Sequence, residues 1–186
     1  MTELALILPL VLLLVFGILE LGSAMNQTLV MTAASREGAR VAGALANGGG
    51  TLGCGGGQSP NATAVDPSVV AAVERVLAGS GTQIYLSDVT AIRIFKATIT
   101  GTETSGAVNL WTYLANGGPL VGGERIDFAE QTSTWPACAR NNVTPADSIG
   151  ITVAYTYRAW TPLHYFMPFA GINLRETTVM SLNATR

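Results

Sequence analysis

Residues 1–22 read MTELALILPLVLLLVFGILELG, and this stretch decides the fold of the chain. No charged residue lies between Leu4 and Leu19, which leaves about 16 consecutive residues of membrane-like hydropathy. That is slightly shorter than the roughly 20 residues that usually cross a bilayer. A tilted helix or a locally thinned bilayer would still permit a span. The stretch therefore predicts contact with a membrane.

Three interpretations of this stretch are open. A cleaved secretory signal needs a basic segment before the apolar block, whereas Glu3 supplies an acid. A plain single-span anchor has no use for Glu3 at the start of the block or for Pro9 inside it. The third interpretation is one long helix over residues 1–47, because no proline follows Pro9 until after the glycine tract at 48–57. About 45 helical residues would span on the order of 68 Å, so the helix is suited to packing against copies of itself. We favour this third interpretation.

Three segments within the predicted helix carry a family resemblance. They are ELALILP at residues 3–9, FGILELG at 16–22 and ASREGAR at 34–40. Together they resemble the N-terminal signature of TadE-like pilins, the pilins and pseudopilins of the tight-adherence (Tad) branch of type IV pilus systems. A weaker resemblance returns at residues 155–157, 161–163 and the closing strand through Met180. Family members carry a basic leader, with the acid usually fifth in the mature chain, whereas here it is third. Either the chain starts near the processed terminus or its start was assigned by other means.

The resemblance implies a structural subunit that polymerises through its N-terminal helix into an extracellular pilus used for surface attachment. The implied partners are copies of the same chain and an assembly machinery of prepilin peptidase, inner-membrane platform and assembly ATPase. The implied location is the cytoplasmic membrane before assembly and the cell surface afterwards. Two alternatives remain, a minor or priming pilin and a membrane-anchored adhesin or binding module that never polymerises. An anchored hydrolase is a remote third.

Glu3 and Pro9 are the first two candidate assembly residues. A carboxylate near the membrane is unfavourable unless it is paired, and a helix N-terminus lowers that penalty. In a filament the natural partner of Glu3 is the free α-amino group of a neighbouring subunit, as the resemblance also implies. The alternative is a simple helix-start acid with Thr2 as the N-cap. Pro9 removes one backbone hydrogen bond, which predicts a kink or a locally melted segment.

Glu20, Arg36 and Arg40 are the other candidate assembly residues. Glu20 interrupts the apolar run near its end. It either marks the boundary with water or pairs with Arg36 or Arg40 of an adjacent helix.

The remaining residues, 48–186, are predicted to form an extracellular α+β head with one helix on an antiparallel sheet. A helix is expected to begin at Asp66 and Pro67, with Asp66 as its cap, and to end at Gly79. Alternating apolar residues predict strands; the expected strands cover residues 84–86, 89–100, 149–160 and 172–184. Residues 101–148 are rich in glycine and proline and are expected to form a variable, loop-rich surface region.

Cys54 and Cys138 are the two cysteines of the chain. No further cysteine or histidine lies near either of them to complete a zinc or haem motif. On the exported side of a membrane a disulfide is favoured over two free thiols. Closing a loop of about 85 residues would stabilise the head by roughly 4–5 kcal/mol.

Composition and motifs argue against an enzyme and against direct binding of nucleic acid. Charged residues make up 12% of the chain and its net charge is −2, so no basic patch is expected. No nucleophile, zinc-protease or calcium-loop motif is present, so no cofactor or metal is expected. The single histidine, His164, lies in an aromatic segment and is interpreted as structural. Sequons for glycosylation occur at Asn26, Asn61, Asn142 and Asn183, and we regard Asn61 and Asn142 as the candidate acceptors.

Overall fold

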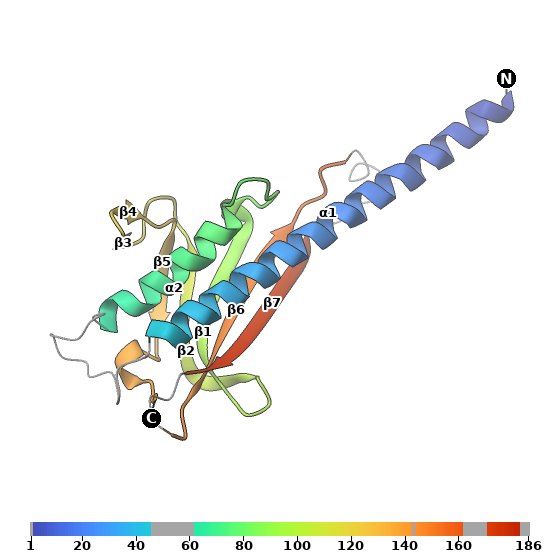
Figure 1. Ribbon diagram of the computed structural model, residues 1–186. Helices are drawn as coiled ribbons and strands as arrows, with labels where there is room; N and C mark the ends of the chain where they lie inside the picture. The colour runs from blue at the N-terminus through green and yellow to red at the C-terminus, as the bar shows by residue number, and fades with distance from the viewer. Residues whose placement is uncertain (1, 46–61, 143, 162–170, 183–186) are drawn as a thin grey trace.

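The computed structural model describes residues 2–45, 62–142, 144–161 and 171–182. The first helix, α1 (Thr2–Leu45), is continuous. Its N-terminal half, the projecting half, extends away from a head, and its C-terminal half, the packed half, lies on that head (Figure 1). The head adds helix α2 (Ala62–Leu77) and an antiparallel sheet. The predicted long N-terminal helix and the α+β fold class are therefore confirmed.

The sheet has five strands in the order β5-β2-β1-β6-β7, and every neighbouring pair is antiparallel. The strands are β1 (Val89–Ala97), β2 (Glu103–Tyr113), β5 (Phe128–Ser133), β6 (Ser148–Tyr157) and β7 (Ile172–Ser181). Smaller elements are the hairpin of β3 (Leu120–Val121) and β4 (Glu124–Arg125) and the two 3-10 turns η1 (Leu86–Asp88) and η2 (Ala137–Ala139). The central strand β1 pairs with β6 in a register that places Ile94 opposite Ile151.

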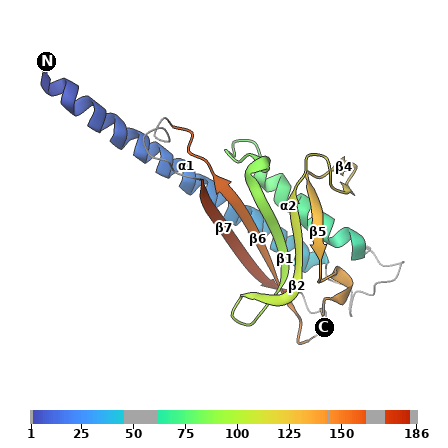
Figure 2. The ribbon, with the colours of Figure 1, turned by 180° about the vertical axis from the view of Figure 1, so that it is seen from behind.

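Both helices cover the same face of this sheet (Figures 1 and 2). Alternate residues of each strand point to this face because the side chains of a strand alternate between its two sides. The buried core between helices and sheet contains Met31, Ala34, Ala39, Val69, Val73, Leu77, Ile92, Ile94, Ile149, Ile151 and Val153. On the opposite face the contacts are more polar, such as the hydroxyl pair of Thr152 and Thr177 at 2.7 Å. The head is thus a two-layer structure with one core.

Helix α1 contributes to that core through small residues. Ala34, Ala39 and Ala42 are buried, and a Cβ atom on Gly38 would lie 2.6 Å from Cγ2 of Val73. Small side chains let α1 approach α2 and the sheet closely. The predicted boundary at residue 47 therefore does not separate the helix from the head, because the second half of α1 is part of the head's core.

Several predictions about the head need correction. The loop-rich region predicted for residues 101–148 contains the 11-residue strand β2 and the strand β5. Strand β2 was missed because only alternate residues at its C-terminal end, Asn109 and Trp111, are buried, and one of them is polar. Residues 84–86 form no strand, since the 3-10 turn η1 starts at Leu86. Helix α2 begins four residues earlier than predicted, so Asp66 lies inside it rather than capping it.

Candidate functional site

The projecting half of α1 exposes apolar side chains around its whole circumference. The large apolar residues at positions 7–21 are between 42% and 70% exposed, except Phe16, which is half-buried. They are Ile7, Leu8, Leu10, Val11, Leu12, Leu13, Leu14, Val15, Ile18, Leu19 and Leu21. Within Ile7–Leu45 the helix is long and apolar enough to cross a membrane. A helix that is apolar all round is stable only when lipid or protein covers it.

The projecting half of α1 ends and the packed half begins at residues 20–23. Ser23 donates a hydrogen bond to the side chain of Gln83 at 3.0 Å, and the Gln27 side chain donates to the Gln83 carbonyl at 2.9 Å. Both helix residues are buried, although they are polar. The helix thus enters the head through paired polar groups and continues as part of the core.

Glu20 lies at this boundary and binds the head of its own chain. Its carboxylate accepts a short hydrogen bond from the Tyr157 hydroxyl. It also accepts from the backbone N–H groups of Trp160 at 3.2 Å and Thr161 at 3.4 Å. Burial, reinforced by the hydrogen bond to Glu20, raises the pKa of Tyr157 to about 12, so the phenol stays protonated and remains the donor. Neither predicted role of Glu20 included this contact, because 137 residues separate Glu20 from Tyr157.

Arg36 and Arg40 are exposed residues on the packed half of α1. The Arg40 guanidinium pairs with Glu37 of the same helix at 2.5 Å. This hydrogen bond lowers the pKa of Glu37 below its usual value. Arg36 and Arg40 both remain accessible from outside the subunit, so their pairing with another helix stays a prediction.

Glu3 and Pro9 lie in the first turns of α1. The side chain of Glu3 falls outside the described part of the structure, so its role also stays a prediction. Pro9 lies inside the helix, which continues from Thr2 to Leu45 without interruption. Of the two alternatives predicted at Pro9, local melting is therefore absent, and a kink stays a prediction. Proline removes one hydrogen bond, whereas melting would leave several further backbone groups unpaired.

The long apolar helix in front of a small head agrees with the N-terminal helix of TadE-like pilins, which residues 3–40 resemble. Residues 1–40 match the family model of TadE-like proteins. We call residues 1–40 the TadE-like segment. It contains the whole projecting half of α1 and most of the half that packs on the head. The match is consistent with a TadE-like pilin of the Tad pilus system. No curated protein and no solved structure matches the chain significantly.

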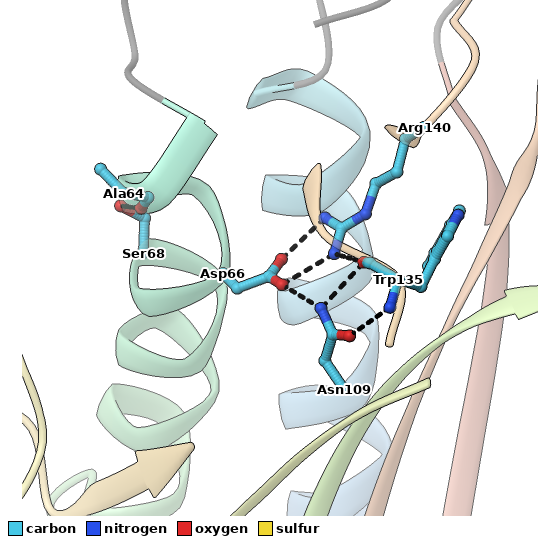
Figure 3. Close-up of polar contacts among 6 residues, drawn as sticks. All are labelled: Ala64, Asp66, Ser68, Asn109, Trp135 and Arg140. Atoms are coloured by element: carbon cyan, nitrogen blue, oxygen red, sulfur yellow. Dashed lines mark hydrogen bonds and ion pairs between the residues drawn. The ribbon is translucent and has the colours of Figure 1, made fainter. Parts of the chain in front are cut away.

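Outside the TadE-like segment the head holds a buried polar cluster, which the sequence did not suggest (Figure 3). The Arg140 guanidinium and the Asp66 carboxylate form an ion pair at 2.7 Å, and both side chains are buried. Asn109 donates to Asp66 at 2.6 Å and accepts from the backbone N–H of Trp135 at 2.8 Å. The Arg140 guanidinium also lies 4.6 Å from the centre of the Trp135 ring. The cluster therefore joins α2, β2 and the segment between β5 and β6.

The structure describes one of the two cysteines predicted to form a disulfide. Cys138 lies in the turn η2, within the segment that the buried cluster holds. Cys54 falls outside the described residues, so the pairing of Cys54 with Cys138 stays a prediction.

The other candidate residues can be placed in part. His164 and Asn61 fall outside the described residues. Asn142 is only 1% exposed, so the folded head does not present its amide to a glycosyltransferase, and this candidate acceptor is not supported. In the part of the chain that the structure describes, no three histidine, cysteine or acidic side chains gather as a metal site would require.

Proposed function

We propose that this protein is a pilin subunit that polymerises through α1 into an extracellular, Tad-like pilus used for surface attachment. The observation that carries the proposal is the projecting half of α1, whose apolar side chains are exposed on all sides of the helix. Burying apolar surface stabilises by about 25 cal/mol per Å², so this half requires a covering environment. A membrane supplies one before assembly and a bundle of neighbouring helices supplies another afterwards. When the subunit moves from the membrane into the filament, its apolar side chains leave lipid and become buried against neighbouring helices.

Two glycines support helix-to-helix packing of the projecting half. A Cβ atom on Gly17 or Gly22 would meet nothing within 4 Å in the single subunit. Small residues on membrane-type helices allow neighbouring backbones to approach closely. These positions are therefore suited to contact with the helices of other subunits.

The head supports the proposal because its fold does not depend on the projecting half. Its core is closed by the second half of α1 together with α2 and the sheet. Each subunit can thus fold in full while its projecting half is in the membrane.

Glu3 would then pair with the α-amino group of a neighbour as the subunit enters the filament. The partners of this step are the prepilin peptidase, membrane platform and ATPase of the pilus system.

The test is electron microscopy of filaments sheared from the producing cells, with mass spectrometry of their main subunit. We expect this chain to be the main component. In cells carrying Glu3→Gln, sheared filaments should fall at least about tenfold, since loss of the ion pair removes a charge interaction of one to a few kcal/mol per subunit in low dielectric.

The matched control is Glu124→Gln, which neutralises an exposed acid in β4 of the head and should leave filament yield unchanged. Filaments that lack this chain, with the chain retained in the membrane fraction, would contradict polymerisation. A membrane-anchored adhesin or binding module would then be the better account. Filaments in which the chain is a trace component would indicate a minor or priming pilin.

A further inference from the structure

Among the described residues, two exposed aromatic side chains lie at one end of the head. Tyr85, just before η1, is 73% exposed, and Trp160, just after β6, is 62% exposed. The other two tryptophans, Trp111 and Trp135, are 2% and 5% exposed. The connection from α2 to β1 and the segment after β6 lie at the end of the head from which α1 projects (Figures 1 and 2). We call Tyr85, Arg158 and Trp160 the basal rim.

Hydrogen bonds fix the position of the basal rim along α1. The backbone N–H of Trp160 binds Glu20, and the residue two before Tyr85, Gln83, binds Ser23 and Gln27. The rim therefore lies beside residues 20–27 of the helix. A depression of about 520 Å³ lies at the same level and is lined by Ser23, Gln27, Tyr85, Arg158 and Trp160 among others.

The uncharged run between Glu3 and Glu20 is close to the thickness of a membrane. The 16 residues from Leu4 to Leu19 rise on the order of 24 Å as an α-helix, somewhat less than the roughly 30 Å of a bilayer's hydrocarbon core, and local thinning of the bilayer can close this difference. The edge of that core then falls near Glu20. The lipid headgroup layer adds about 5–7 Å on each side. About three to five helical residues span such a layer, so it reaches from Glu20 to about residues 23–25. This is the level at which Trp160 is held.

The residue types of the basal rim suit that layer. Tryptophan and tyrosine concentrate at membrane interfaces because an apolar ring there keeps one polar group in contact with water. Arg158 is exposed and makes a 3.2 Å ion pair with Asp88, beside Tyr85. A long arginine side chain can lie along apolar surface while its guanidinium reaches lipid phosphates.

We propose that, before assembly, the basal rim rests in the phospholipid headgroup layer on the side of the membrane that carries the head. The rim adjoins residues 20–27 of α1 and extends the membrane contact from the helix onto the head. It sets how deeply the helix is inserted and how the head is tilted. This inference rests on the membrane-inserted state of the proposed function and does not depend on polymerisation.

The experiment measures tryptophan fluorescence of the full chain in phosphatidylcholine and phosphatidylglycerol vesicles. Lipids brominated on the acyl carbons nearest the headgroup quench tryptophans at that depth, and acrylamide quenches tryptophans in water. We expect brominated lipid to remove the share of the emission that comes from Trp160, and vesicles to protect this share from acrylamide. In Trp160→Phe the bromine-dependent loss should disappear.

The matched control moves the exposed tryptophan to the far end of the head. Ile99, in the turn between β1 and β2, is fully exposed, and the double variant Trp160→Phe with Ile99→Trp replaces one exposed tryptophan by another. Its new tryptophan should be quenched by acrylamide and not by brominated lipid. Both substitutions are at the surface, so folding should be preserved.

Two results would overturn the inference. The first is acrylamide quenching of Trp160 in vesicles without bromine quenching, which would place the rim in water. The second is protection from acrylamide that grows with protein density and occurs without bromine quenching, which would mean that another copy of the chain covers the rim. Flotation of the vesicles separates these outcomes from failure of the proposed function. A chain that does not float with vesicles contradicts membrane insertion itself, whereas one that floats with Trp160 in water contradicts the rim alone.

Discussion

At the scale of single residues, the pair of Asp66 and Arg140 places two opposite charges inside the head. Isolated charges are strongly disfavoured in a protein interior, and this pair is tolerated because each group has several partners. Arg140 binds both Asp66 oxygens, at 2.7 and 2.8 Å, and the carbonyl of Trp135 at 3.2 Å. The cluster holds the segment between β5 and β6 against α2, and the described residues of that segment form no strand.

We expect Asp66→Ala to destabilise the head by about 3–5 kcal/mol, because it leaves the Arg140 guanidinium buried without its counter-charge. Urea unfolding of the full chain in mild detergent, followed by the fluorescence of Trp111 and Trp135, measures this change. The matched control is Glu37→Ala, which breaks the exposed pair with Arg40 and should change stability far less than Asp66→Ala does. Similar small effects of both substitutions would mean that the buried pair contributes little.

At the scale of elements, the close approach of α1 to α2 and β6 depends on Gly38, because glycine has no side chain. Beside the 2.6 Å approach to Val73, a Cβ atom on Gly38 would lie 3.3 Å from Ile151. Glycine inside a helix is intrinsically unfavourable, so its presence here is explained by packing. Residue 38 also lies within the TadE-like segment, whose match thus reaches into the helix–sheet interface.

Gly38→Ala should therefore destabilise the head by about 1–3 kcal/mol through overpacking, despite the better helix propensity of alanine. Gly22→Ala is the control, because a Cβ atom there meets nothing within 4 Å in the subunit. It should stabilise the helix by up to about 1 kcal/mol. Unfolding midpoints of the two variants test the difference. Equal stabilisation by both would show that the interface at Gly38 has room for a methyl group.

At the scale of the whole molecule, α1 has two halves with different roles. The packed half supplies Met31, Ala34, Ala39 and Ala42 to the core, whereas the apolar side chains at 7–15 are all exposed. The limit between the two roles lies at Glu20, which binds Tyr157 and the backbone after β6. The contribution to the core and the exposed apolar surface thus belong to different halves of one helix.

A chain starting at Glu20 should consequently be soluble and monomeric, with a thermal midpoint within a few degrees of the full chain in detergent. A chain starting at residue 48 should show no cooperative transition, because removing several buried side chains at about 2–5 kcal/mol each exceeds the stability of a typical domain. Circular dichroism during heating and size-exclusion chromatography measure both. Cooperative folding of residues 48–186 alone would contradict the role assigned to the packed half of α1.

Local sequence patterns were sufficient for some of these features. The apolar run and the absence of proline between Pro9 and the glycine tract determined the long helix, because helix continuity and hydropathy depend on neighbouring residues. The alternation in residues 149–157 likewise determined β6, which is buried at its centre. The match of residues 1–40 follows from the same local segments.

Only the tertiary structure decided how these elements are used. Strand β2 was hidden in its sequence because it gains its stability from pairing with β1 and β5 rather than from its own pattern. The partners of Glu20 and Asp66 lie 137 and 74 residues away, and no local rule relates such positions. The division of α1 at Glu20 likewise depends on contacts between residues far apart in the sequence. The apolar character of the helix is a property of the chain, whereas which half is buried in the head depends on where the sheet and α2 meet it.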